Sequence, residues 1–327
     1  MYRIKSAFTI GNYKIDFCNT VQIESGWADL TDTATLVLPR KIVDVDRTIF
    51  NGPDAIFNVG DPLDIELSYT DFDPVTRFKG FISDVDPKLP IRLMAEDAMF
   101  LMRRFTLTKS FKAVSLQELI DYVFTEGAKK ETRLNDYKPV VNVSINLGVF
   151  RINRGTGAQV FEELKKKYGI NTYVKGNEFI IGFSYSEVNQ NIKTFTFEDN
   201  IIDDDLVYKK AEDVKLKVKA VSIDRDNKKT TIEIGDADGE QRTLHYYNKD
   251  EDTLRKLATE QLDKLKYTGY RGSFTTFLHP YVQHSQPINI VSKRLPERNG
   301  KYYIAKVNTN SGVGGGRQEI TLDRVSL

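Results

Sequence analysis

The stretch GDPLDIELSY (residues 60–69) has an echo near the other end of the chain, in SQPINI (285–290). Each begins with turn formers, continues with proline and then alternates aliphatic with polar residues, the period-two pattern of a half-buried strand. FISDV (81–85) follows the first stretch and YIAKV (303–307) the second, and we match Ile91 and Leu93 with Ile320 and Leu322. Any two runs of antiparallel strands share some of this pattern, but the common order of features predicts two copies of one β-rich unit.

Residues 1–105 are predicted to be mostly strands, at 33–39, 62–69, 77–85 and 91–97. Turn formers separate them at 51–53, 71–74 and 86–87. Gly80 is a candidate bulge within its strand. Asp97 is expected to cap a short helix that carries residues 99–102.

Residues 106–190 change character and predict a small α/β domain. Ser115 with Glu118 and Thr156 with Gln159 are two capping boxes, each followed by an apolar helical stripe. Gly169 is expected to end the second helix. The dipeptide 176–177, Gly-Asn, then lies between two β-rich segments and predicts a hairpin.

Residues 191–327 return to strands, with one helix near 253–267 that Asp252 or Thr253 is expected to cap. Two hairpins are expected, at Asp238-Gly239 and at Asn299-Gly300. The fold class is therefore α+β, mainly β. We expect two similar β-barrel domains, 1–105 and 191–327, flanking a small α/β domain at 106–190.

The composition limits the range of functions. The 327 residues include 47 basic and 46 acidic side chains, which argues against a strongly basic nucleic-acid-binding protein. The single cysteine, Cys18, excludes an intramolecular disulfide and a site with several thiolates from one chain. The N-terminus lacks the apolar core of a secretory signal, and no apolar stretch approaches the length of a membrane helix. A protein folded in a reducing cytosol is the simplest interpretation.

The motif search yields no catalytic, cofactor or metal residue. Neither GxxxxGK[ST] nor HExxH nor GxSxG is present. The remaining candidates have structural explanations that we prefer. Gly312–Gly316 is interpreted as a hairpin loop, His279 and His284 as structural or surface histidines, and Asp203–Asp205 and Asp236–Glu240 as turns. Glu96-Asp97 is interpreted as a strand end followed by a helix cap, and the lysines 209, 210, 215, 217 and 219 as a solvated strand face. His245 lies beside Tyr246 in a predicted strand and has no partner visible in the sequence.

The order of these segments resembles a known family. VGDPLDIELSY, RFKGFISDV and IRLMAEDAMFLMRR come first, GVFRINRGTGAQVFEELKKKYGINTYVKGNEFIIGF follows, and FEDNIIDDDLVYKKAEDVKLKVKAVS comes before the late helix and final hairpin. This layout looks like the baseplate hub proteins of contractile phage tails, related to the late control protein D family. It is similar more distantly to the hub portion of type VI secretion spike proteins.

The resemblance implies a structural, non-enzymatic protein of the virion tail or baseplate, assembled in the bacterial cytoplasm. Such hubs are homotrimers that contact a sixfold tail tube, a threefold spike and other baseplate proteins. Three chains with two similar domains each would supply six comparable surfaces. No cofactor is implied, and lysozyme or needle parts would be separate proteins. Two alternatives remain: a tail-associated cell-wall hydrolase, which needs paired carboxylates or a metal site, and a glycan-binding module, which needs exposed aromatic side chains.

Overall fold

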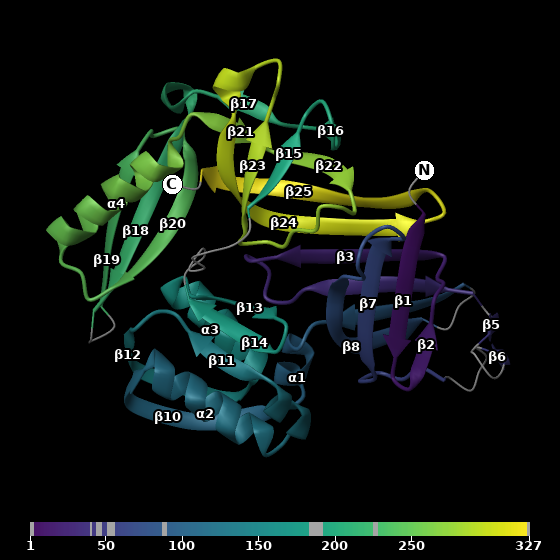
Figure 1. The fold of residues 1–327 in the computed structure, drawn as a ribbon. Coiled ribbons are helices and arrows are strands. Elements are labelled where there is room, and N and C mark those ends of the chain that lie inside the picture. Colours follow the sequence, from purple (N-terminus) through teal and green to yellow (C-terminus); the bar gives the residue numbers. More distant parts are fainter. Residues whose placement is uncertain are drawn as a thin grey trace.

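Strands form most of the secondary structure of this chain (Figure 1). The computed structural model describes residues 3–39, 41–43, 48–50, 56–86, 90–182, 192–224 and 228–325. The expected fold class, α+β and mainly β, is confirmed. The turn expected at 51–53, Pro87 of the turn at 86–87, and the domain boundary near 190 lie outside the described residues.

The N-terminal part contributes seven strands to one large sheet that is antiparallel except for the pair β15–β23. Its strand order is β3-β4-β9-β8-β7-β1-β2, and β5 and β6 pair separately. The strands are β1 (Ile4–Ile10), β2 (Tyr13–Ile15), β3 (Thr20–Gly26), β4 (Thr33–Leu38), β5 (Lys41–Val43), β6 (Thr48–Phe50), β7 (Pro62–Tyr69), β8 (Thr76–Asp86) and β9 (Ile91–Glu96).

The C-terminal part forms the other end of the same sheet, in the order β16-β22-β25-β24, with β23 beside β24 and β15 beside β23. Two further short strands, β17 and β21, pair with each other. These strands are β15 (Lys193–Thr196), β16 (Ile201–Asp204), β17 (Val207–Lys209), β21 (Gly269–Arg271), β22 (Ser273–Phe277), β23 (Pro287–Val291), β24 (Gly300–Gly312) and β25 (Gly315–Val325).

The two ends of the chain share one strand topology. The order β3-β4-β9-β8-β7 is repeated as β16-β22-β25-β24-β23, and within each set the strands occur in the same chain order. We call these sets the first and the second repeat. Their strands also have separate buried cores, one around Leu36 and Leu63 and the other around Phe274 and Tyr302.

The equivalence extends to individual residue pairs. Pro62 lies opposite Phe81 in the first repeat, and Pro287 lies opposite Tyr303 in the second. The next residues of the long strands, Ile82 and Ile304, also have equivalent contacts. The Gly60 N–H donates to the Ile82 carbonyl and the Ser285 N–H donates to the Ile304 carbonyl, both at 2.8 Å. Both long strands then have a register shift directly after that isoleucine. The shared bulge supports a common unit, because bulges reset which residues face each other.

Two details of the expected echo are wrong. Leu93 lies opposite Val85, and Ile320 lies opposite Val307, so Leu93 corresponds to Ile320 rather than to Leu322. Gly80 is not the bulge. A Cβ atom there would lie 2.1 Å from the Glu96 carbonyl oxygen, so Gly80 permits the close approach of a neighbouring strand.

The two repeats are joined into one 13-stranded sheet, and the strand pairs of the described residues close neither repeat into the expected barrel. The link is the antiparallel pair β3–β24, which runs from Gly26 opposite Lys306 to Thr20 opposite Gly312. β24 is long enough to pair with β23 along its first half and with β3 along its second. Figure 1 shows β3 and β24 side by side at the centre of the molecule.

The central segment packs below this sheet in Figure 1 around a further apolar core, to which Phe81 of the first repeat and Val221 and Ile223 of a later segment also contribute. Both expected capping boxes are present: Ser115 with Glu118 before α2, and Thr156 with Gln159 before α3. Gly169 ends α3 in the left-handed conformation, at φ +68°. The elements are α1 (Met99–Arg103), β10 (Thr106–Ser115), α2 (Leu116–Ala128), a 3₁₀ turn (Thr132–Asp136), β11 (Lys138–Val141), β12 (Asn146–Thr156), α3 (Gly157–Tyr168), β13 (Asn171–Lys175) and β14 (Glu178–Gly182).

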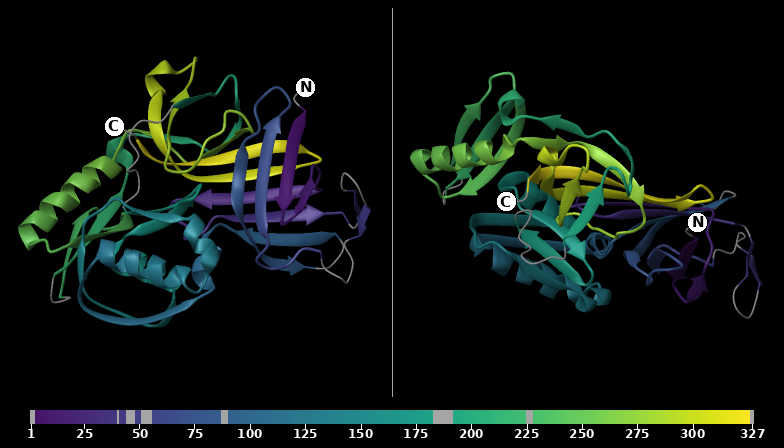
Figure 2. Two further views of the ribbon diagram at one scale, coloured as in Figure 1. Left: turned by 60° about the horizontal axis from the view of Figure 1, so that its bottom comes forward. Right: turned by 45° about the horizontal axis from the view of Figure 1, so that its top comes forward.

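The late helix belongs to a larger insertion between β17 and β21, which extends away from the main sheet in both views of Figure 2. This insertion has its own core, in which α4 packs on the three-stranded sheet β19-β18-β20. Asp250, not Asp252 or Thr253, caps the helix, since its side chain accepts from the Thr253 N–H. The elements are β18 (Leu216–Ile223), β19 (Lys229–Gly235), β20 (Glu240–Tyr247) and α4 (Glu251–Leu265).

Two expected hairpins have different geometry. The turn at Asp238-Gly239 does not join paired strands, because the apolar strand β18 lies between β19 and β20. Gly235 and Gly239 let this link cross close over Leu216. Near Asn299, β23 and β24 do pair, but a longer connection with a 3₁₀ turn at Pro296–Arg298 joins them.

Candidate functional site: the joint between the repeats

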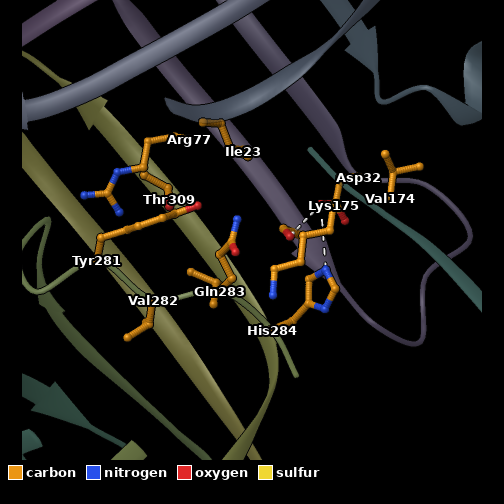
Figure 3. A pocket seen from close by; sticks show the side chains of 12 residues that line it. Ile23, Asp32, Arg77, Val174, Lys175, Tyr281, Val282, Gln283, His284 and Thr309 are labelled. Atoms are coloured by element: carbon orange, nitrogen blue, oxygen red, sulfur yellow. Dashed lines mark hydrogen bonds and ion pairs between the residues drawn. The ribbon is translucent and has the colours of Figure 1, made fainter. Parts of the chain in front are cut away.

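A group of interacting polar side chains lies where the two repeats meet, and we call this place the repeat joint (Figure 3). It surrounds a cavity of about 50 Å³ between β3, β8, β13, β24 and the loop that joins β22 to β23. The side chains that line the cavity are those of Ile23, Ser25, Asp32, Arg77, Val174, Lys175, Tyr281, Val282, Gln283, His284, Val307 and Thr309.

Arg77, on β8 of the first repeat, crosses to the second repeat. Its Nε donates to the Leu67 carbonyl at 3.2 Å, Nη1 donates to Gln318 Oε1 at 3.2 Å, and Nη2 donates to the Leu278 carbonyl. The guanidinium carbon also lies 4.3 Å from the ring centre of Tyr281. Burial lowers the pKa of Arg77 to about 10. The planar guanidinium thus binds three acceptor oxygens, one from the first repeat and two from the second, and holds the two repeats together.

Tyr69 makes the second link. Its buried hydroxyl accepts from the Leu278 N–H at 3.2 Å and donates to the Gly316 carbonyl at 3.3 Å. Gln318, which Arg77 contacts, in turn donates to the Pro280 carbonyl at 2.6 Å. Side chains from both repeats therefore hold the loop after β22. These hydrogen bonds restrict the rotation of one repeat relative to the other.

Two carboxyl groups, the buried Asp97 and the partly buried Asp32, lie at the other end of the joint. Asp97 accepts from Thr31 Oγ1 and from the backbone N–H groups of Asp32 and Met99, at 2.8–2.9 Å. Asp32 accepts from Ser25 Oγ at 2.6 Å. Burial raises the pKa of Asp97 to about 6, although these hydrogen bonds oppose it. Burial and the nearby charge of Asp97 raise the pKa of Asp32 well above its usual value.

His284 completes this group. Its Nε2 lies 4.0 Å from Asp32 Oδ2. Its ring packs edge-on against the ring of Tyr173, with the two ring centres 4.9 Å apart. Burial, with a smaller contribution from Lys175, lowers the pKa of His284 to about 4. The imidazole is therefore neutral at pH 7. Tyr173 belongs to β13, so the joint also contacts the central segment.

This geometry suits a mechanical joint. The polar groups are engaged with backbone and side-chain partners that hold elements together, and the cavity has room for about one or two water molecules. In the part of the chain that the structure describes, no group of three or more His, Cys, Asp or Glu side chains is arranged to hold a metal ion. Among those same residues, no helix is long and apolar enough to cross a membrane.

The residues singled out in the sequence have mostly structural surroundings. Gly312 and Gly315 pair in the tight turn between β24 and β25, as expected. His279 stacks on Phe72, with ring centres 3.9 Å apart. Asp236 accepts from the Leu216 N–H. Asp97 is not the N-cap of α1 as expected: Ala98 holds that position without a side-chain hydrogen bond, and the Asp97 side chain, one residue earlier, accepts from the Met99 N–H.

The basic strand face is largely neutralised. Lys217 lies 2.7 Å and Lys219 3.4 Å from the carboxylate of Glu233, and Lys215 pairs with Asp238. His245 faces a separate cavity of about 660 Å³ between the insertion and the central segment. Cys18 is partly covered, and burial raises its pKa to about 12, which makes it a poor nucleophile.

Sequence reasoning missed Arg77, Tyr69 and Asp32. Each occupies an ordinary position in a strand or turn, and none belongs to a motif. The signal that could have drawn attention to Arg77 was a lone cation at the start of the echoed strand; its partners Leu278 and Gln318 are about 200 residues or more away.

The chain has the fold of phage and prophage tail proteins and of a type VI secretion component. It resembles the tail protein from Neisseria meningitidis MC58, with a TM-score of 0.66, 14% identity, and coverage of 99% of this chain and 97% of that chain. It also resembles the 43 kDa tail protein of prophage MuSo2 from Shewanella oneidensis, with a TM-score of 0.60, 12% identity and 98% coverage of both chains.

A third similar structure is the E. coli c3393 protein, described as a component of the type VI secretion system. Its TM-score is 0.58 at 9% identity, over 98% of this chain and 77% of that chain. No protein-family model and no curated protein matches the chain. The likeness to tail proteins is thus carried by the fold, not by the sequence.

Proposed function

We propose that this chain is a structural hub protein of a phage tail baseplate or of a related contractile injection system. In this proposal it forms a homotrimeric ring that adapts a sixfold tail tube to a threefold spike, and it also contacts other baseplate proteins. The tail proteins it resembles in fold support the general role. It acts by shape and not as an enzyme, and it resides in the virion tail after assembly in the bacterial cytoplasm.

The observation that carries the proposal is the repeated strand topology with its repeated register. Three copies of a chain with two equivalent repeats present six similar surfaces, although the ring has only threefold symmetry. Pro62 opposite Phe81 and Pro287 opposite Tyr303 are the same pair in the two repeats. The bulge after Ile82 recurs after Ile304, so the surfaces beyond it also correspond.

The repeat joint supports the same role. A sixfold partner can bind both repeats only if the angle between them is constant. The crossing contacts of Arg77 and Tyr69 restrict that angle. We further propose that 1–105 and 191–327 act as the two ring domains and that 106–190 projects from the ring.

Native mass spectrometry and light scattering at high micromolar concentration test the proposal. We expect a trimer, and in negative-stain images a ring whose averages have six similar lobes. The matched comparison is the same chain with the tail tube protein encoded nearby in its genome, which should bind one face of the ring. A protein that stays monomeric alone and with that tube protein would contradict the proposal.

A further inference from the structure

We propose that β17 of one copy of this chain adds, as an antiparallel strand, to the last residues of β8 of the next copy, with Lys209 opposite Asp84. The inference rests on the proposed trimer and names the contact that would close it. The edge of β17 and the edge at the end of β8 would each be paired with a strand of another copy of the same chain.

The argument starts from the contact that the chain already makes with itself. Within one chain, the edge of β3 in the first repeat pairs with the second half of β24 in the second repeat. In a ring that alternates first and second repeats, the contact between chains joins a second repeat to the next first repeat. If the ring is pseudo-sixfold, that contact uses the surfaces that correspond to β3 and to β24.

The surface that corresponds to the second half of β24 is the end of β8. Lys306 lies just after the bulge that follows Ile304, and Asp84 lies just after the bulge that follows Ile82. Lys306 pairs with β3 inside the chain. Among the described residues, β8 pairs only with β7 and β9, and its β7 partners end at Phe81. The backbone edge of Asp84 and Val85 is therefore open on the side where β24 receives β3.

The surface that corresponds to β3 is β16 together with β17. Val21 lies opposite Leu36, and Asp204 lies opposite Phe274, at the same place in the ladder. β17 continues β16 in an unchanged register, because Tyr208 lies opposite Tyr270 as Asp204 lies opposite Phe274. Val21 and Asp204 are therefore equivalent positions in the two repeats. Five residues after Val21 is Gly26, the residue opposite Lys306, and five residues after Asp204 is Lys209. Lys209 is thus the counterpart of Gly26.

This register brings complementary groups together. Lys209 meets Asp84, and Tyr208 meets Val85. Both charged residues are exposed, and no ion pair holds either within the described part of the chain. Val207, beside them, is a large apolar side chain with 53% of its surface exposed. A free strand edge, an exposed valine and opposite charges in register are the features of an edge that receives another strand.

The two open edges lie toward opposite ends of the 13-stranded sheet, since β16 ends the sheet order and β8 lies near the other end. One copy can therefore offer β17 to a second copy while its β8 receives a third. Such a head-to-tail contact closes into a ring when the rotation between neighbouring copies is a whole fraction of a turn, which is one third in the proposed trimer.

Disulfide trapping tests the register. We would make Asp84→Cys with Lys209→Cys in one chain, in a Cys18→Ser background, and oxidise it mildly. Residues directly opposite each other on paired strands lie within disulfide reach. We expect most of the protein to run as a covalent trimer without reductant. The matched control is Asp84→Cys with Lys210→Cys, which moves the second cysteine one residue out of register, just beyond β17, and should give several-fold less trimer.

Charge exchange gives an independent readout in the full-length chain. Lys209→Asp and Asp84→Lys should each lower the trimer fraction several-fold, and the two changes together should restore it. If the protein is a trimer by light scattering but the cysteine pair forms no disulfide, the proposed register is wrong and the proposed function still stands. The same holds if the protein is a trimer and the double charge variant does not restore the trimer fraction. A wild-type chain that remains monomeric both alone and with the tail tube protein would overturn both.

Discussion

Replacing Arg77 by methionine removes the guanidinium that bridges the two repeats and keeps a side chain of similar length. Its three acceptors are the Leu67 and Leu278 carbonyls and the side-chain oxygen of Gln318. A buried acceptor left without a donor costs roughly 1–3 kcal/mol. Water entering the adjacent cavity offsets part of that loss. We therefore expect the Arg77→Met variant to lose about 3 kcal/mol of unfolding free energy, within the range for a broken buried network.

Urea unfolding measures the total loss, and amide hydrogen exchange locates it. The chain has several separate cores, so the exchange data carry the structural test. Protection should fall in the loop after β22 and in the second half of β24, while α2 in the central segment stays unchanged. Arg255→Met, on the exposed face of α4, is the matched control and should cost about 0.5 kcal/mol or less.

The coupling between Arg77 and Gln318 gives a sharper measure. In a double-mutant cycle with Gln318→Leu, direct contact predicts an interaction energy of about 0.5–3 kcal/mol. If Arg77→Met is as mild as the Arg255 control, or if its exchange changes spread evenly over the whole chain, Arg77 does not hold the joint.

Three further outcomes follow from the structure. Gly80→Ala should destabilise the chain by about 2 kcal/mol or more, because its Cβ would lie 2.1 Å from the Glu96 carbonyl oxygen; Gly314→Ala, with nothing within 4 Å, should change little in the same urea titration. Ser115→Ala removes the cap of α2 and should cost about 1 kcal/mol by thermal unfolding, and an unchanged midpoint would contradict the cap's role. Because burial lowers the pKa of His284 to about 4, its neutral form stabilises the fold above pH 6.5, and that contribution is lost as the pH falls toward 4. His284→Gln should therefore gain up to about 3 kcal/mol relative to wild type between pH 6.5 and 4, and parallel pH profiles of the two proteins would refute the assignment.

The local elements were predictable because short-range chemistry determines them. Ser115 and Thr156 start α2 and α3 where the capping boxes predicted, and Gly169 ends α3. The strands at 33–38 and 62–69 follow the period-two alternation. The echo between residues 60–69 and 285–290 was also correct in kind, since the same turn, proline and strand recur with one backbone register.

The errors arose wherever partners distant in sequence decide the outcome. Asp238-Gly239 has the composition of a hairpin turn, but the strands it joins flank β18, since that apolar strand takes the central place. The joining of the two repeats into one sheet also depends on such partners, because the second half of β24 pairs with β3, about 280 residues away. No local pattern reports such a pairing.

The sequence by itself determined the helices, most strands and the presence of two related halves, because caps, glycines and alternating side chains act within a few residues. Only the tertiary structure decided how the halves meet. Arg77, Tyr69 and Asp32 carry no motif, and their importance comes from burial beside groups that the chain brings in from the other repeat. The free energy of that joint depends on distance in space, which a linear sequence of 327 residues does not display.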